Sequence, residues 1–339
     1  MKKIVCSVVF LLTFVMSAEG GRSVLTVNYP PDRTVMELDL LSVSLGLPQG
    51  SADMIKVRVN DEERISIVPD SGFECFTVRL SPGVNAIDVT AFKKGREIDS
   101  VEFSVFRRSD LEAAYQKAPA DFQKDYFHSK KRKECAECHV LVPTDADKKP
   151  VNPASFKAAL QEGDKQAIAS SSTCYSCHSK ITSYPYVHGP ASVWSCLSCH
   201  DAETEPMYMV KKPDAEVCFS CHVEQGRDWG AKKFIHGPVN TGKCAICHSP
   251  HASDNPFNLL KPTWFLCTSC HQKNASGRHI IAGYVYGDSH PTRGKPDPLR
   301  NGKELTCASC HNPHASDYPR LWALSAGSAF ELCQMCHQK

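Results

Sequence analysis

The chain has 339 residues, 18 cysteines and nearly balanced charge, with 39 lysines and arginines against 37 aspartates and glutamates. This length excludes a small scaffold held together by disulfides and suggests about two domains. Balanced charge gives no reason to expect a nucleic-acid partner.

Residues 1–20 have the pattern of a secretory signal peptide. Lys2 and Lys3 precede a short apolar run over 4–16, and small residues at Ala18 and Gly20 offer a cleavage site. A retained anchor is the alternative, but the run is too short to span a bilayer, and we see no transmembrane segment later in the chain. We therefore expect an exported protein, periplasmic or at the cell surface, in a compartment that oxidises thiols.

Residues 24–108 predict an all-β domain. Seven short runs alternate in hydrophobicity, as at Ile55, Val57 and Val59, and turn residues such as Asn60-Asp61 separate them. This spacing predicts a β-sandwich, and "LSPGVNAIDVTAF" resembles bacterial Ig-like modules. Cys75 alternates with buried-type residues, so we expect it on the outer face, as a free thiol or in an intermolecular disulfide.

Beyond residue 108 the pattern changes twice. Residues 109–134 carry apolar residues at helical spacing and predict a helical linker. Residues 135–339 are rich in proline, lysine and Cys-His clusters, and predict a mostly irregular domain with short helices. Because this region has little apolar periodicity, its side chains cannot form an ordinary hydrophobic core. We therefore expect another group to fill the interior.

The motif C-x-x-C-H occurs eight times in this second region. Its cysteines are Cys135, Cys138, Cys174, Cys177, Cys196, Cys199, Cys218, Cys221, Cys244, Cys247, Cys267, Cys270, Cys307, Cys310, Cys333 and Cys336. The histidines that end the motifs are His139, His178, His200, His222, His248, His271, His311 and His337.

Three kinds of site use paired cysteines: tetrahedral zinc, redox-active disulfides and c-type haem. Zinc and disulfides place no demand on the residue after the second cysteine. Covalent haem does, because two thiols form thioethers and the adjacent imidazole binds iron as proximal ligand. A histidine in all eight positions therefore predicts eight covalently attached haem c groups.

Seven histidines remain as candidates for the second axial ligand, since low-spin electron-carrier haems need one and imidazole is common there. His251 and His314 follow their own motif histidine by three residues, so we expect each to serve a different, adjacent haem. The seven are His128, His188, His236, His251, His279, His290 and His314.

The motifs also repeat as larger units. "FIHGPVNTGKCAICHSPHASD…WFLCTSCH" aligns with "DSHPTRGKPDPLRNGKELTCASCHNPHASD…FELCQMCH": an upstream histidine, a motif, a Pro-His and a second motif. The pattern resembles the doubled C-x-x-C-H family of multihaem cytochromes, related to the pentahaem carriers of nitrite reduction and to cytochrome c3-like proteins. The resemblance covers 188–339 well and 128–187 weakly. It implies an electron-transfer protein with closely stacked, mainly bis-histidine haems.

Eight haems and seven spare histidines leave one iron without a histidine. The gap falls in the first two units, where no Pro-His occurs, and Met207 or Met209 could supply the ligand. Lysine, water or a histidine of another subunit are the other candidates.

These features predict an octahaem electron conduit of anaerobic respiration, not an enzyme. Its partners would be a quinol-linked donor at the inner membrane and an outer-membrane or extracellular acceptor, with the β-sandwich for docking or self-assembly. One alternative is a reductase of nitrite, hydroxylamine or a sulfur oxyanion at an open haem. The other is a subunit of an extracellular cytochrome filament.

Overall fold

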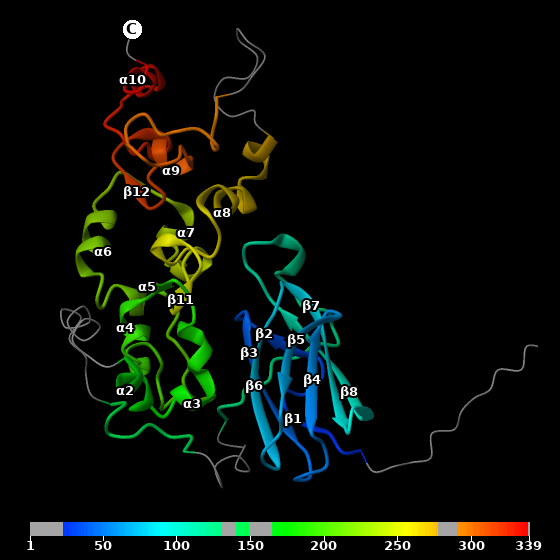
Figure 1. Ribbon diagram of the computed structural model, residues 1–339. Coiled ribbons are helices and arrows are strands. Elements are labelled where there is room, and N and C mark those ends of the chain that lie inside the picture. Colours follow the sequence, from blue (N-terminus) through cyan, green and yellow to red (C-terminus); the bar gives the residue numbers. More distant parts are fainter. Residues whose placement is uncertain (1–22, 130–139, 149–164, 277–289, 338–339) are drawn as a thin grey trace, which may run out of the picture.

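The computed structural model describes residues 23–129, 140–148, 165–276 and 290–337. The expected signal peptide therefore lies outside the described residues, as do the first C-x-x-C-H motif and His279. An N-terminal β-rich region stands beside a C-terminal region of short helices, which runs as a column from α2 and α3 to α10 (Figure 1). A β-rich half followed by an irregular, short-helical half is the order that the sequence predicts.

The N-terminal region consists of two sheets, in which every neighbouring pair is antiparallel except β2 and β8. The first has the order β1-β3-β6, with β1 (Thr26–Tyr29), β3 (Leu40–Gly46) and β6 (Phe73–Arg79). The second has the order β2-β8-β7-β4-β5, with β2 (Thr34–Met36), β8 (Arg96–Arg107), β7 (Gly83–Lys93), β4 (Met54–Val59) and β5 (Glu62–Ile67).

Alternating residues of both sheets form one buried core. Ile55, Val57 and Val59 are at most 2 % exposed, as their alternation predicts, and they belong to the same cluster as Leu41 and Leu45 of the other sheet. Burying each such side chain contributes about 1.5–3 kcal/mol, so this core can hold the two sheets together.

Two tight hairpins set the register of the five-stranded sheet. Asn60 and Asp61, between β4 and β5, both have positive φ (51° and 66°), and so do Lys94 and Gly95 (50° and 72°) between β7 and β8. Two consecutive residues of positive φ form the turn whose twist matches paired strands. The turn at Asn60-Asp61 is one that the sequence predicts.

The helix expected over 109–134 is wrong for the described part of that segment. Only a short 3-10 turn, η1 (Ala113–Tyr115), forms there. Pro119 disfavours helix in the residue before it, and Gln123 instead pairs with β2, donating to Arg33 and accepting from Val35. Backbone pairing with the sheet outweighs the weak helical pattern of the segment.

The C-terminal region is made of elements one or two turns long. Its helices are α2 (Lys165–Ser170), α3 (Tyr175–His178), α4 (Gly189–Ser192), α5 (Ala215–Cys218), α6 (Val223–Gly230), α7 (Gly237–Asn240), α8 (Thr263–Cys270), α9 (Cys307–Cys310) and α10 (Ala329–Gln334). Its 3-10 turns are η4 (Ser179–Thr182), η5 (Cys196–Ser198), η6 (Cys244–Ile246), η7 (Pro256–Asn258), η8 (Gln272–Ser276) and η9 (Pro319–Leu321).

Two small antiparallel sheets connect distant parts of the C-terminal region. β9 (Tyr186–Val187) pairs with β11 (Ala252–Ser253), and β10 (Phe234–Ile235) pairs with β12 (Ala315–Ser316). Each sheet joins the residues just before an upstream histidine to those just after a Pro-His histidine of the next unit. The repeated units are therefore tied together by backbone hydrogen bonds.

The outer face of β3 and β6 lies against the C-terminal region. The Ser42 hydroxyl donates to the Cys177 carbonyl at 3.2 Å, and Arg79 pairs with Asp254 at 3.0 Å. Cys75 is exposed on β6, on the outer face as its alternation predicts. The two regions thus meet along the three-stranded sheet.

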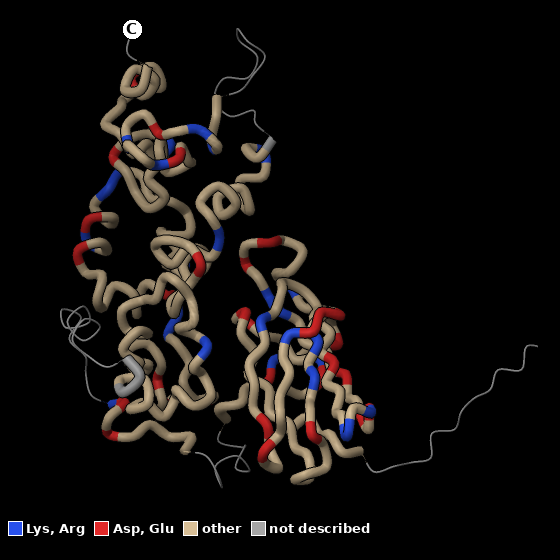
Figure 2. The backbone as a smooth tube through the Cα atoms, viewed as in Figure 1, with Lys and Arg blue, Asp and Glu red and all other residues tan. Residues whose placement is uncertain are grey.

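Charged residues of both signs are interspersed along the chain, in keeping with its balanced total (Figure 2). Within the described ranges, no helix has the length and apolar character needed to cross a bilayer.

Candidate functional site

The seven described C-x-x-C-H motifs share one backbone hydrogen bond. In each, the histidine N–H donates to the carbonyl of the first cysteine at 2.9–3.1 Å, which closes a single helical turn. This turn brings two thiols and one imidazole together within five residues. The second histidines and the rest of each site must come from other parts of the chain.

Six pairs of imidazole rings face each other at almost the same distance. Their ring centroids are 6.0–6.1 Å apart, and five of the six pairs are within 37° of parallel. Each pair joins one motif histidine to one of the seven histidines predicted as second ligands. The pairs are His128–His178, His188–His222, His200–His251, His236–His271, His248–His314 and His290–His337.

This distance fits a metal between two rings. A metal–imidazole nitrogen bond is about 2 Å long, so two bonds in line and half of each ring span about 6 Å. Other aromatic contacts of the same histidines vary, from 4.1 Å for Trp229–His314 to 5.3 Å for Phe127–His128. The uniform separation is thus a property of these six pairs, and with two thiols beside each motif histidine they fit a haem c.

The pairs follow one rule along the repeat. An upstream histidine, such as His188 or His236, faces the second motif of its own unit. A Pro-His histidine instead faces the first motif of the preceding unit, so His251 faces His200 and His314 faces His248. Neither Pro-His histidine faces the motif histidine three residues before it.

Backbone carbonyls orient the rings. Since a carbonyl only accepts, the 2.9 Å contact between His188 Nδ1 and the Pro250 oxygen means that Nδ1–H donates and Nε2 is left for a metal. Pro313 hydrogen-bonds His236 in the same way. Each Pro-His dipeptide therefore orients one histidine through its proline carbonyl and presents its own histidine to a second partner.

The motif histidines have a similar support that the sequence analysis missed. The Nδ1 atoms of His200, His248 and His311 lie 2.7–2.8 Å from the carbonyls of Tyr208, Phe257 and Arg320, respectively. All three of those residues have positive φ, between 57° and 65°. The shared signal in the sequence is a proline or methionine before a bulky residue, eight or nine positions after the motif.

Burial keeps the candidate ligands neutral. It lowers the pKa values of His128, His251 and His314 to about 4, with a further contribution from neighbouring histidines. A neutral imidazole is the form that binds a metal. The interior therefore prepares these side chains for ligation at neutral pH.

Thiols of consecutive motifs also meet. Three pairs of thiols lie close enough to shift each other's pKa values: Cys174 and Cys196, Cys218 and Cys244, and Cys267 and Cys307. In the first of these pairs, the nearby Cys196 thiol lowers the pKa of Cys174 to about 6. The attachment points of neighbouring motifs are thus adjacent along the column.

Some predicted site residues are not placed by these contacts. Cys135, Cys138, His139 and His279 lie outside the described residues. Met207 lies next to His128, to whose carbonyl its N–H donates at 2.9 Å, while Met209 is 40 % exposed. Among the described residues, no three His, Cys, Asp or Glu side chains converge as a tetrahedral zinc site would require.

Comparisons with solved structures give only distant similarity. Fibronectin(III)-like modules of CbhA from Clostridium thermocellum match at 13 % identity and a TM-score of 0.22, over 24 % of this chain and 94 % of that one. An FMN-binding β-glucuronidase from Facaelibacterium prausnitzii and a β-glucuronidase from Bacteroides uniformis match at 13 % and 11 % identity, with TM-scores of 0.21 and 0.22. The matches span 29 % and 27 % of this chain but only 13 % and 11 % of those enzymes, and scores this low support no conclusion about it.

No curated protein matches the chain. A family model described as the doubled CXXCH motif matches residues 188–227, 236–276 and 297–339. The first two matches begin at upstream histidines, so they coincide with the repeated units defined by the ring pairs. CXXCH motifs indicate covalently bound haem c, and three doubled motifs support the assignment of this chain as a multihaem c-type cytochrome.

Proposed function

We propose that this protein is an exported octahaem electron carrier of anaerobic respiration, with its haems held mainly between two histidines. One observation carries the proposal: six imidazole pairs with ring centroids 6.0–6.1 Å apart, each including one motif histidine. Bound haem supplies reversible one-electron iron chemistry. The chain's own residues attach the group, bind the iron from both sides and orient the ligands.

A conduit is favoured over isolated sites because the candidate sites are contiguous. Thiols of neighbouring motifs lie within range of each other at Cys174–Cys196, Cys218–Cys244 and Cys267–Cys307. The motifs follow one another along the column in chain order (Figure 1). Electrons entering at one end would therefore find a continuous series of sites. We propose a quinol-linked donor at the inner membrane and an outer-membrane or extracellular acceptor.

The β-rich region is proposed as an Ig-like docking or self-assembly module. Its outer sheet face already packs on the C-terminal region through Ser42 and Arg79. The remaining surface of the sandwich is available to a partner or to a second copy. No reductase activity is proposed, because every motif ends in histidine.

The pairing rule also supports a proposal for the remaining ligands. The iron of the first motif should be bound from the segment after His200, which has no histidine. Met207 lies there, and the Tyr208 hydroxyl next to it donates to the Leu141 carbonyl at 2.8 Å, two residues after His139 in the sequence. We therefore propose Met207 for the first motif, which leaves His279 for His311.

The test is low-temperature EPR with near-infrared MCD on the oxidised holo-protein, after a mass measurement that counts the haems. Eight haems, all low-spin, with one methionine-to-iron band would support the proposal. A high-spin signal from one iron in eight that shifts with nitrite or hydroxylamine would replace the carrier with a reductase. A protein without covalent haem would refute both.

A further inference from the structure

A pocket lined by both apolar and basic residues opens at the edge of the β-sandwich where β5 and β6 lie. Its volume is about 450 Å³, and its lining includes Arg64, Arg79 and Arg107 but no acidic residue. Thr77 and Ser81 add hydroxyl groups to the same wall. The lining therefore offers hydrogen-bond donors and positive charge.

The three arginines differ in their partners. Arg64 pairs with Glu62, and Arg79 pairs with Asp39 at 3.1 Å and Asp254 at 3.0 Å. Across the described ranges, Arg107 has no carboxylate within 4.0 Å; its Nη1 donates to the Leu80 carbonyl at 2.9 Å, and its Nε is buried without a hydrogen-bond partner. Arg107 is thus the arginine of this pocket without an anion.

A buried guanidinium without a carboxylate partner would be stabilised by an anion. Burial lowers the pKa of Arg107, and the neighbouring Arg79 cation adds to the effect while Asp39 opposes it. A buried, unpaired charge and an unmade hydrogen bond both destabilise a fold. The planar fork of arginine matches a carboxylate through two parallel hydrogen bonds.

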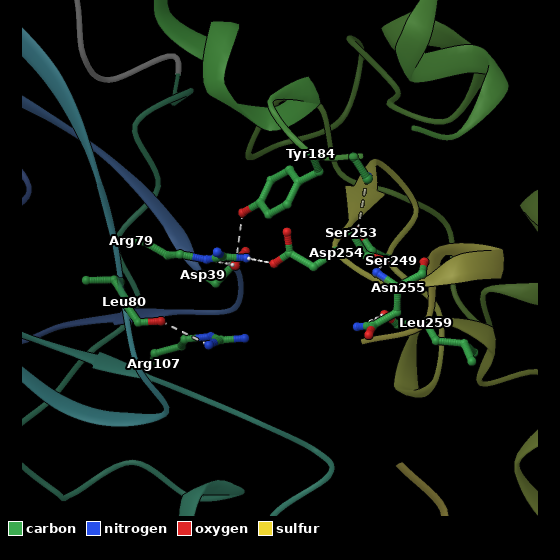
Figure 3. A network of polar contacts seen from close by, with 11 residues as sticks. Asp39, Arg79, Leu80, Arg107, Tyr184, Ser249, Ser253, Asp254, Asn255 and Leu259 are labelled. Atoms are coloured by element: carbon green, nitrogen blue, oxygen red, sulfur yellow. Dashed lines mark hydrogen bonds and ion pairs between the residues drawn. The ribbon is translucent and has the colours of Figure 1, made fainter. Parts of the chain in front are cut away.

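The arginines point toward the region that carries the histidine pairs. Arg79 and Arg107 run side by side from the sandwich toward the loop of Asp254 and Leu259 (Figure 3). That loop follows His251, whose ring faces His200. The Asp39 carboxylate acts on both Arg107 and His251 and partly opposes the lowering of their pKa values by burial, so each of these two groups lies within range of the Asp39 charge.

We propose that Arg107, assisted by Arg79, binds a propionate carboxylate of the haem attached to Cys196 and Cys199. The inference rests on the proposed function, because it requires a haem between His200 and His251. Haem c carries two propionates on the part of the ring away from its thioethers, so they are the carboxylates that the cofactor would bring to this interface. The β-sandwich would then set the potential of one haem as well as pack against it.

The experiment compares Arg107→Gln, Arg107→Lys and Arg64→Gln holo-proteins in potentiometric titrations followed by EPR and MCD. We expect Arg107→Gln to lower one midpoint, because a cation near the ring favours the reduced, less positive iron. A tenfold change in that equilibrium corresponds to 59 mV for a one-electron couple. Arg107→Lys should restore most of the shift, and Arg64→Gln, whose arginine already has Glu62, should leave all midpoints in place.

A His251→Ala background identifies the haem, since loss of this ligand would give a high-spin signal that marks the iron facing His200. A shift of the marked midpoint supports the assignment, and a shift elsewhere overturns it. Unchanged midpoints in Arg107→Gln, with full haem content, overturn it as well. Binding of inorganic phosphate to the wild-type holo-protein, lost in Arg107→Gln, would show that the pocket takes an external anion instead. Absence of covalent haem from the wild type would refute the proposed function first, so the two failures are distinguishable.

Discussion

Five of the twelve paired imidazoles have a backbone carbonyl at Nδ1 and face their partner with the rest of the ring: those of His188, His200, His236, His248 and His290. His188, for example, donates from Nδ1 to Pro250 and faces His222 with the rest of its ring. Such outer contacts set the tautomer and the orientation of a metal ligand. Substituting single histidines should therefore change one iron at a time.

His314→Ala should convert one haem to high spin, and that haem should be the one attached to Cys244 and Cys247. The reason is that His314 faces His248 and not His311. EPR on the oxidised protein measures the high-spin fraction. The Cys244→Ser, Cys247→Ser variant lacks the haem of this one motif, so adding His314→Ala to it should produce no further high-spin signal. A further high-spin signal would assign His314 to another iron.

Met207→Leu should abolish the methionine-to-iron band in near-infrared MCD and lower the potential of one haem. Methionine in place of histidine raises a haem potential, so its loss acts in the opposite direction. Met209→Leu is the matched control, because Met209 is 40 % exposed and should leave the band unchanged. A band lost in the control instead would reassign the ligand.

Acid should break the ligation only at low pH. A histidine in an unfolded chain has a pKa near 6.5, whereas the pKa values of His128, His251 and His314 are lowered to about 4. The unfolded state therefore binds more protons between these values, and stability falls as pH drops through that window. We expect the low-spin absorption spectrum to persist at least to about pH 5, because the pKa of about 4 applies before iron binds and ligation lowers it further; conversion near pH 6 would contradict this reasoning.

At the scale of elements, the strands were more predictable than the connections. Ile55, Val57 and Val59 alternate with polar residues, and this local period predicts β4 and its buried face. The segment 109–129 has a helical pattern, but its backbone bonds to β2, a contact between residues far apart in sequence. A local sequence pattern cannot show that backbone pairing with a distant strand will outweigh formation of a helix.

The same limit applies to the candidate site. The C-x-x-C-H motif fixes a proximal ligand within five residues, because one helical turn brings its groups together. His251 could have served several irons, and only the pairing of β9 with β11 and the contact with His200 choose among them. The spacing of the motifs predicts which histidines are candidate ligands, and the contacts between units show which of them face each other.

Gly83→Ala tests the junction between β7 and the segment that follows the sheet. Gly83 has φ +94°, and an added Cβ would lie 2.8 Å from Cε1 of Tyr115. We expect a loss of about 1–3 kcal/mol in the free energy of unfolding, measured by urea titration with far-UV circular dichroism. Gly50→Ala is the control: Gly50 also has positive φ (+69°) but open space around it, so the loss should be about 1 kcal/mol or less. Equal losses would exclude the contact with Tyr115.

At the scale of the molecule, two regions of different construction are joined by polar contacts. Arg79 pairs with Asp254, Lys261 with Glu112 at 2.8 Å, and the Tyr184 hydroxyl donates to Asp39 at 3.1 Å. The Arg79–Asp254 pair is more than half exposed, and exposed pairs contribute only about 0–1 kcal/mol each. No single pair should therefore hold the regions together.

Asp254→Ala and Lys261→Ala should each leave the radius of gyration unchanged, and their combination should increase it. Small-angle scattering measures the change directly. Lys56→Ala is the control, because Lys56 pairs with Glu63 of the same N-terminal region and does not connect the two regions. An unchanged radius in the double variant would show that Ser42, Tyr184 and their neighbours suffice to hold the interface.

Each Pro-His histidine faces a motif of the preceding unit, and this arrangement affects how the number of units in such a chain can change. His251 faces a motif histidine of the unit before it, and His314 does the same one unit later. If a whole unit were duplicated within the series of repeats, its Pro-His histidine would face the unit before it, and the Pro-His histidine of the next unit would face the duplicated one. A break within a unit would leave its neighbour incomplete. Duplication of one unit could therefore lengthen the column by two motifs, and the histidines needed to pair with them would be copied along with it.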